Sequence, residues 1–196
     1  TVGSAVTQAD RHWTGDGTWD TSTARWATSS GGPNHACWTG NDNAILGGKP
    51  GTVTLSEDIA LKHLKFTATS SGYTIAGKTL NFGPNGSITQ SVGTPNNVQH
   101  TISSAITGSP SVHIATNTNY QGLTFAPIDG TVTLGTCMVP SEQGASDKAG
   151  LMLGGTTKDN SVKEVTYHRA RRYGTLWKDG ESTWSVGKVK IGTVRL

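Results

Sequence analysis

The side chains best suited to binding chemistry gather in one segment, from Tyr167 to Trp184, which reads YHRARRYGTLWKDGESTW. It contains four arginine or lysine residues, two tyrosines and two tryptophans. An exposed aromatic ring offers an apolar face on which a sugar ring can stack, and a guanidinium offers paired donors for hydroxyls or carboxylates. In a strand, Tyr167, Arg169 and Arg171 share one face, because alternate residues point the same way. The segment therefore predicts a carbohydrate-binding surface, and the alternative is a solvated loop whose arginine stems cover apolar surface.

We expect most contacts with the ligand to come from this segment and one more from the separate loop NTNYQG. Nucleic-acid binding uses similar arginine and tyrosine chemistry. However, a formal net charge of +3 and one local basic cluster give no continuous basic groove for phosphates, so we expect no nucleic-acid partner. The candidate ligand-binding residues are Tyr167, Arg169, Arg171, Tyr173, Trp177 and Tyr120.

Residue types used in catalysis and metal binding do not fall into known patterns in this chain. The acidic residues are scattered, with Glu57 and Asp58 as the only adjacent pair, whereas glycoside hydrolases need two facing carboxylates and calcium sites need several. The six histidines show no ligand spacing, and neither a Gly-x-Ser-x-Gly nor a His-Glu-x-x-His motif occurs. We therefore expect no enzyme activity, no cofactor and no metal. A polysaccharide lyase or hydrolase stays as an alternative, because a folded chain can bring distant acids together.

The elements that would position these residues are short strands. From Thr52 onward, runs such as TVTL, YTIAGKTLNF and SVHIAT carry β-branched or aromatic residues at period two between Gly, Pro, Asn or Ser. The best helical candidate, SEDIALKHLKF, alternates almost as well as it rotates. Strand centres recur about every ten residues, which a sandwich and a solenoid both predict. Few two-residue hairpin turns and an interior of small aliphatic residues favour the solenoid.

The first fifty residues differ from the rest and predict a cap on the open end of this solenoid. They carry Trp13, Trp19, Trp26 and Trp38 among polar, glycine-rich loops, and we favour a plug over an exposed sugar-binding platform for these rings. The chain is thus expected to form one domain over residues 1–196, with a cap in 1–50 and stacked coils in 51–196. Whether the two cysteines, at positions 37 and 137, form a bridge is open.

Two parts of the sequence resemble autotransporter-associated β-strand repeat proteins. The first comprises WTGDGTWDTSTARW, CWTGNDNAILGGKPGTVTL and YTIAGKTLNF, and the second is LWKDGESTWSVGKVKIGTVRL. The second part departs from the repeat at Ser182, where the family usually has glycine. This resemblance implies a right-handed parallel β-helix on a secreted or cell-surface bacterial protein. It is carried in the second part by Lys178, Gly180, Thr183, Trp184, Val186, Gly192, Thr193 and Val194.

A second resemblance, of overall character, is to the β-helical carbohydrate-binding modules of glycoside hydrolases, whose ligand is xylan. It implies a non-catalytic module that binds a plant cell-wall polysaccharide outside the cell and is linked to a catalytic domain. The alternative from the first resemblance is a structural or adhesive passenger fragment of a secreted bacterial surface protein. No apolar run of about 18 residues occurs, so we expect no membrane span, and the chain has the character of a mature or excised segment.

Overall fold

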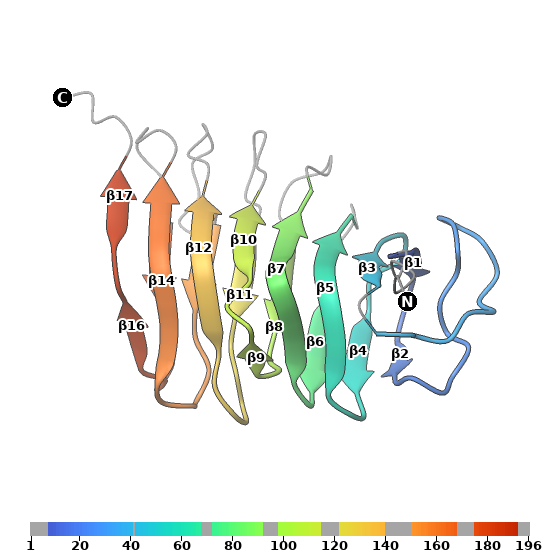
Figure 1. The fold of residues 1–196 in the computed structure, drawn as a ribbon. Coiled ribbons are helices and arrows are strands. Elements are labelled where there is room, and N and C mark those ends of the chain that lie inside the picture. Colours follow the sequence, from blue (N-terminus) through green and yellow to red (C-terminus); the bar gives the residue numbers. More distant parts are fainter. Residues whose placement is uncertain are drawn as a thin grey trace, which may run out of the picture.

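Two parallel β-sheets run the length of the molecule, as the strands lying side by side in Figure 1 show. The computed structural model describes residues 8–40, 42–67, 72–91, 98–114, 122–139, 150–167 and 175–191. These residues form seventeen strands and no helix, which confirms the all-β prediction. Within the same ranges there is consequently no helix of the length and apolarity that crossing a membrane requires.

The larger sheet, sheet A, has ten strands. Two of them lie beside the main path: β9 (Ile106–Thr107) pairs with β7, and β17 (Val189–Ile191) pairs with β14. The other eight follow the order β1 (Asp10–Trp13), β3 (Asn43–Leu46), β5 (Ile59–Phe66), β7 (Leu80–Gln90), β10 (Ser111–Ile114), β12 (Thr133–Val139), β14 (Asn160–Tyr167) and β16 (Trp184–Val186).

The smaller sheet, sheet B, has seven strands, which alternate along the chain with those of sheet A. Each coil therefore contributes a strand to each sheet. After the first coil, strand partners lie from 20 residues apart, as for Asn43 and His63, to 28 apart, as for Thr133 and Ser161. The strands of sheet B are β2 (Gly17–Trp19), β4 (Thr52–Leu55), β6 (Thr74–Gly77), β8 (Gln99–Ile102), β11 (Gly122–Phe125), β13 (Gly150–Leu153) and β15 (Thr175–Lys178).

Alternating side chains build the core between the two sheets. In β4, Val53 and Leu55 are buried while the flanking threonines are exposed. Val53 pairs with Ile75, and Ile75 pairs with Ile102, so aliphatic side chains stack in rows from coil to coil. Burying one such side chain contributes about 1.5–3 kcal/mol. Stacking of incomplete coils thus supplies the core that no single coil contains.

The segment with mixed helical and strand character is strand β5. Its apolar side chains Ile59, Leu61, Leu64 and Phe66 are all buried. A shift of register between Leu61 and His63 places two consecutive residues on the outside of the strand. This irregularity gives the three-residue spacing between Leu61 and Leu64, which is why the sequence imitates a helix there.

Gly77 ends β6 at a close approach between coils. Its φ is 103°, and a Cβ added there would run into the carbonyl oxygen of Leu55. We expect Gly77→Ala to lower the free energy of unfolding by about 2 kcal/mol or more, because backbone strain and a steric clash add. Chemical denaturation measures the loss. Gly83→Ala is the matched control, since a Cβ there meets nothing within 4 Å, and equal losses in both variants would contradict the assignment.

His100 is a buried polar residue inside the solenoid, with 1% of its surface exposed. Its ring stacks on Phe66 at 4.3 Å between centroids, and its Nδ1 accepts the Tyr73 backbone N–H at 2.9 Å. Burial lowers the pKa of His100 from 6.5 to about 4. Because Nδ1 is the acceptor of this bond, protonating it would also break the contact with Tyr73. The histidine is therefore neutral in the folded protein at neutral pH.

The lowered pKa of His100 predicts acid sensitivity. Between pH 6.5 and about 4 the unfolded chain protonates this histidine while the folded chain does not. Folding stability should therefore fall with decreasing pH through that window, by about 3 kcal/mol in total. Urea melts at half-unit pH steps test this. His100→Gln keeps a side chain able to accept hydrogen bonds without a titrating group, and an undiminished slope in that variant would refute the assignment to His100.

Candidate functional surface

The tryptophan-rich cap is a plug, as the sequence predicted. Trp13, Trp19, Trp26 and Trp38 are each at most 2% exposed. Trp26 lies at the centre, with its ring 5.0, 4.8 and 4.9 Å from those of Trp13, Trp19 and Trp38. The segment around Trp26 also covers the outer edge of sheet A, where His12 and Ala27 exchange backbone hydrogen bonds. These four rings are therefore unavailable for stacking on sugars.

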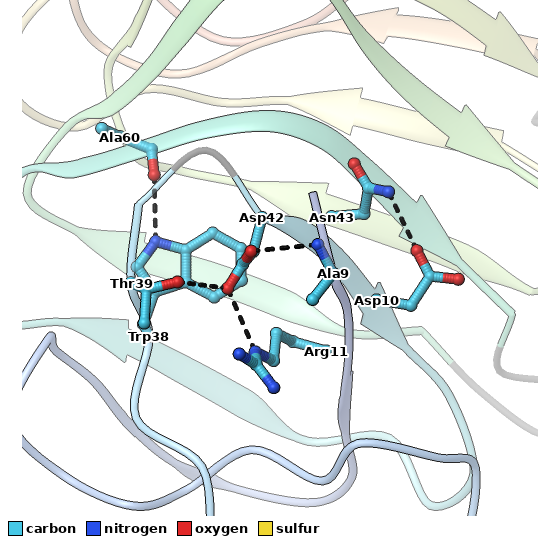
Figure 2. A network of polar contacts seen from close by, with 8 residues as sticks. All are labelled: Ala9, Asp10, Arg11, Trp38, Thr39, Asp42, Asn43 and Ala60. Atoms are coloured by element: carbon cyan, nitrogen blue, oxygen red, sulfur yellow. Dashed lines mark hydrogen bonds and ion pairs between the residues drawn. The ribbon is translucent and has the colours of Figure 1, made fainter. Parts of the chain in front are cut away.

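A buried carboxylate ties this cap to the first coils (Figure 2). Asp42, 4% exposed, accepts hydrogen bonds from Arg11 Nε at 3.0 Å, Thr39 Oγ1 at 2.6 Å and the Ala9 backbone N–H at 3.1 Å. The neighbouring Trp38 donates from Nε1 to the Ala60 carbonyl at 2.9 Å. Segments more than thirty residues apart are thus joined at one carboxylate, a role that the sequence alone did not indicate.

The cysteines lie in different parts of the molecule and are both free thiols. Cys37 belongs to the cap and is partly exposed, whereas Cys137 is buried in β12. Burial raises the pKa of the Cys137 thiol to about 12, so this residue behaves as a small apolar side chain. The structure therefore resolves the open question of a bridge in favour of two separate thiols.

Tyr167 is the one candidate binding residue whose side chain the structure describes. It ends β14 with 8% of its surface exposed, and it pairs with Val139 of the preceding coil. Burial, with a smaller contribution from Cys137, raises the pKa of its hydroxyl. The ring packs in the core, so it presents no stacking face to a ligand.

The other five candidates are not brought together by the described part of the chain. Tyr120, Arg169, Arg171 and Tyr173 lie outside the described residues. Trp177 is in β15, where its backbone pairs with Met152, and only its backbone is described. Their role as ligand contacts stays a prediction.

The outer face of sheet A carries polar and charged side chains in rows across the coils. Lys65, Thr89, His113 and Met138 occupy successive positions in one row. In the neighbouring row, His63 Nδ1 and Ser87 Oγ are 2.8 Å apart. Burial, with a smaller contribution from Lys62, lowers the pKa of His63, which favours the neutral ring in this hydrogen bond. This pair joins adjacent coils and we assign it to coil stacking.

The outer face of sheet B has a different chemistry. Strands β2, β4, β6, β8, β11 and β13 contain no Asp, Glu, Lys or Arg. One row across the coils consists of Thr52, Thr74, Thr101 and Thr124, followed by Met152. In the described ranges, no three His, Cys, Asp or Glu side chains come together in a way that could hold a metal ion.

Stacked parallel coils, rows of aliphatic residues inside and polar rows outside define a parallel β-helix, a class of elongated scaffold. Comparison with known proteins adds one relative, the adhesin BmaC autotransporter of Brucella suis biovar 1 (strain 1330), which is 36% identical over 114 residues. The match covers 51% of this chain but only 3% of that much longer protein. No family model matches the chain, and no solved structure does. The likeness supports the resemblance to autotransporter repeats, and nothing found supports the resemblance to xylan-binding modules.

Proposed function

We propose that this chain is an adhesive or structural segment of a bacterial surface protein, exposed at the cell surface or secreted. The observation that carries the proposal is the parallel β-helix together with the 36% identity to an autotransporter adhesin. A solenoid suits such a role because its length grows with each added coil while its outer faces stay accessible. The sheet B face, which carries no Asp, Glu, Lys or Arg in the six strands from β2 to β13, and the charged sheet A face offer two different surfaces for contacts with another cell.

Attachment of coated beads to cultured mammalian cells tests the adhesive role. Beads that carry the folded chain should attach several times more often than beads coated with albumin or with the heat-denatured chain. Attachment no better than that of albumin-coated beads would contradict the adhesive role. A structural role can then be tested by inserting the chain as a spacer into a surface-displayed protein with a terminal tag. The spacer should increase the distance between the tag and the membrane. Failure of both measurements would overturn the proposal.

Xylan binding by a non-catalytic module is the competing interpretation, and the same preparation can test it. Electrophoresis through gels that contain soluble xylan would retard a xylan-binding module without releasing reducing ends. Release of reducing ends would instead identify a lyase or hydrolase. The proposed surface function predicts unchanged mobility and no product. The burial of Tyr167 removes one of the contacts on which the xylan hypothesis relied.

A further inference from the structure

A small open pocket lies beside the cap on the outer side of sheet A. It has a volume of about 180 Å³ and is bounded by the end of β1, the turn after β3, the end of β5 and the cap loop near Ser30. Three successive coils therefore contribute to one cavity. Its polar lining side chains are His12, Thr14, Ser30, Asn34 and Thr67.

The lining combines a mainly apolar surface with these polar side chains, and it carries no Asp, Glu, Lys or Arg side chain. The guanidinium of Arg25 is engaged outside the lining: its Nη2 donates to the carbonyls of Thr14 at 3.0 Å and Asp16 at 2.6 Å. It also lies 4.7 Å from the Trp13 ring centroid.

Thr14 Oγ1 already bonds to the Lys49 backbone, and Thr67 Oγ1 donates to the Leu46 carbonyl. Each of these hydroxyl oxygens can still accept one more hydrogen bond. An apolar surface with uncharged polar groups therefore suits a neutral ligand that has both an apolar ring face and several hydroxyls.

Two glycines of the turn after β3 allow close packing in the wall of this cavity. A Cβ at Gly47 would lie 2.5 Å from Thr67 Oγ1, and a Cβ at Gly48 would lie 2.9 Å from Thr14 Oγ1. Gly48 also has a φ of 58°, which favours glycine. Side chains at these positions would clash with the two hydroxyls. Glycine there thus lets both threonine hydroxyls pack against the turn after β3 and stay part of the lining.

The size of the cavity limits the ligand. Pockets for drug-sized molecules have volumes of about 300–1,000 Å³, so a cavity of about 180 Å³ accommodates a single ring. Trp13 contributes a wall but no stacking face, since it is 2% exposed and its Nε1 donates to the Gly15 carbonyl at 2.8 Å. We propose that the pocket binds one neutral sugar residue at the end of a cell-surface glycan. This inference rests on the adhesive function proposed above.

Titration of the isotope-labelled full chain with simple glycosides tests this inference. The probes are the methyl glycosides of glucose, galactose, mannose and N-acetylglucosamine, with methyl glucuronide as the charged comparison. At least one neutral glycoside should shift the backbone amide signals of Gly31 and Gly47, with a dissociation constant of about 1 mM, the weak range expected of a single ring. The inference is overturned if none of the four shifts these signals, or if only the charged glycoside does.

Two matched tryptophan substitutions locate the site. Ser30 lines the cavity and is exposed, so Ser30→Trp should fill it and weaken binding at least about tenfold. Thr28 is exposed in the same loop but does not line the cavity, so Thr28→Trp should bind like the unmodified chain. Thr67→Val, which removes one lining hydroxyl at nearly constant volume, should weaken binding several-fold. Unchanged binding in folded Ser30→Trp and Thr67→Val would overturn the assignment.

The bead assay separates this inference from the proposed function. If glycoside binding is lost in Ser30→Trp and bead attachment falls with it, the pocket is the adhesive site. If Ser30→Trp beads attach like those of the unmodified chain, the surface function stands, and the inference that the pocket binds a cell-surface glycan fails. If glycosides bind but no beads attach, the sugar site stands as a binding site and the adhesive function fails.

Discussion

Replacing Trp26 with alanine is expected to lower the free energy of unfolding by about 4 kcal/mol, the cost typical of removing a fully buried tryptophan. Trp26 is 0% exposed and is the ring that touches all three of the other tryptophans in the plug. Its removal leaves a cavity that rigid neighbouring rings cannot fill by moving. It also loosens the segment that covers the edge of β1. Urea denaturation followed by tryptophan fluorescence and circular dichroism measures the loss.

Trp184 provides the matched control at the other end of the solenoid. It is partly buried against the core, and its Nε1 donates to the Gly154 carbonyl at 3.1 Å and to Ser182 Oγ at 3.0 Å. Because less of its ring is enclosed, Trp184→Ala should cost about half as much as Trp26→Ala. An equal or larger cost at Trp184 would show that the N-terminal plug has no special part in stability.

The indole nitrogens allow a finer comparison within the plug. Trp38 Nε1 donates to the Ala60 carbonyl, whereas Trp26 Nε1 is buried and has no acceptor among the described residues. Phenylalanine keeps most of the apolar ring but has no N–H group. Trp38→Phe should therefore lose more stability than Trp26→Phe, by about 1 kcal/mol, the usual contribution of one hydrogen bond. The reverse order would contradict the hydrogen-bond assignment.

The solenoid could be predicted from the sequence because its determinants are local. Each short strand shows which residues are buried through its own alternation, as TVTL does in β4. Glycines and other turn formers mark where one strand ends and the next begins. The plug was predictable for a related reason, since four tryptophans in a short polar segment must be either buried together or exposed together. The irregularity in β5 was not predictable, because the register shift depends on the strand beside it.

The position of Tyr167 could not be judged from residue type alone. Its tyrosine ring and the nearby arginines have the chemistry of a binding surface, but strand geometry places it in the core. In β14, Lys163 and Glu164 both lie outside the core, so the alternation restarts at Val165. Val165 and Tyr167 are then buried together. The apolar Val165, two residues before Tyr167, is the sequence signal that Tyr167 faces the core.

The Asp42 network was missed because its contacts are long-range. Ala9 lies 33 residues before Asp42, and Arg11 lies 31 before it. In sheet A, Asp10 pairs with Asn43, a separation larger than in later coils because the cap segment is inserted between them. A single aspartate in a loop carries no periodic signal. Only the folded first coil shows that this carboxylate has three donors around it (Figure 2).

Asp42→Ala is expected to cost about 4 kcal/mol, in the range found when one partner of a buried ion pair is removed. The side chains of Arg11 and Asp42 are only 17% and 5% exposed, so the guanidinium would stay largely buried without its partner. The Thr39 hydroxyl and the Ala9 N–H would lose their acceptor as well. Thermal and urea denaturation measure the effect.

Two further variants distinguish loss of the network from loss of charge in general. Asp10→Ala removes an exposed carboxylate that holds the Asn43 side chain at 2.9 Å, and a surface change of this kind shifts stability by about 0.5 kcal/mol or less. In the double variant Asp42→Ala with Arg11→Met, the buried charge is gone together with its partner. Part of the stability should therefore return, because an unpaired buried charge costs more than an apolar replacement of the pair. If the double variant is no more stable than Asp42→Ala alone, the guanidinium is not what makes the single change costly, and the backbone contact at Ala9 and the hydroxyl of Thr39 must account for it instead.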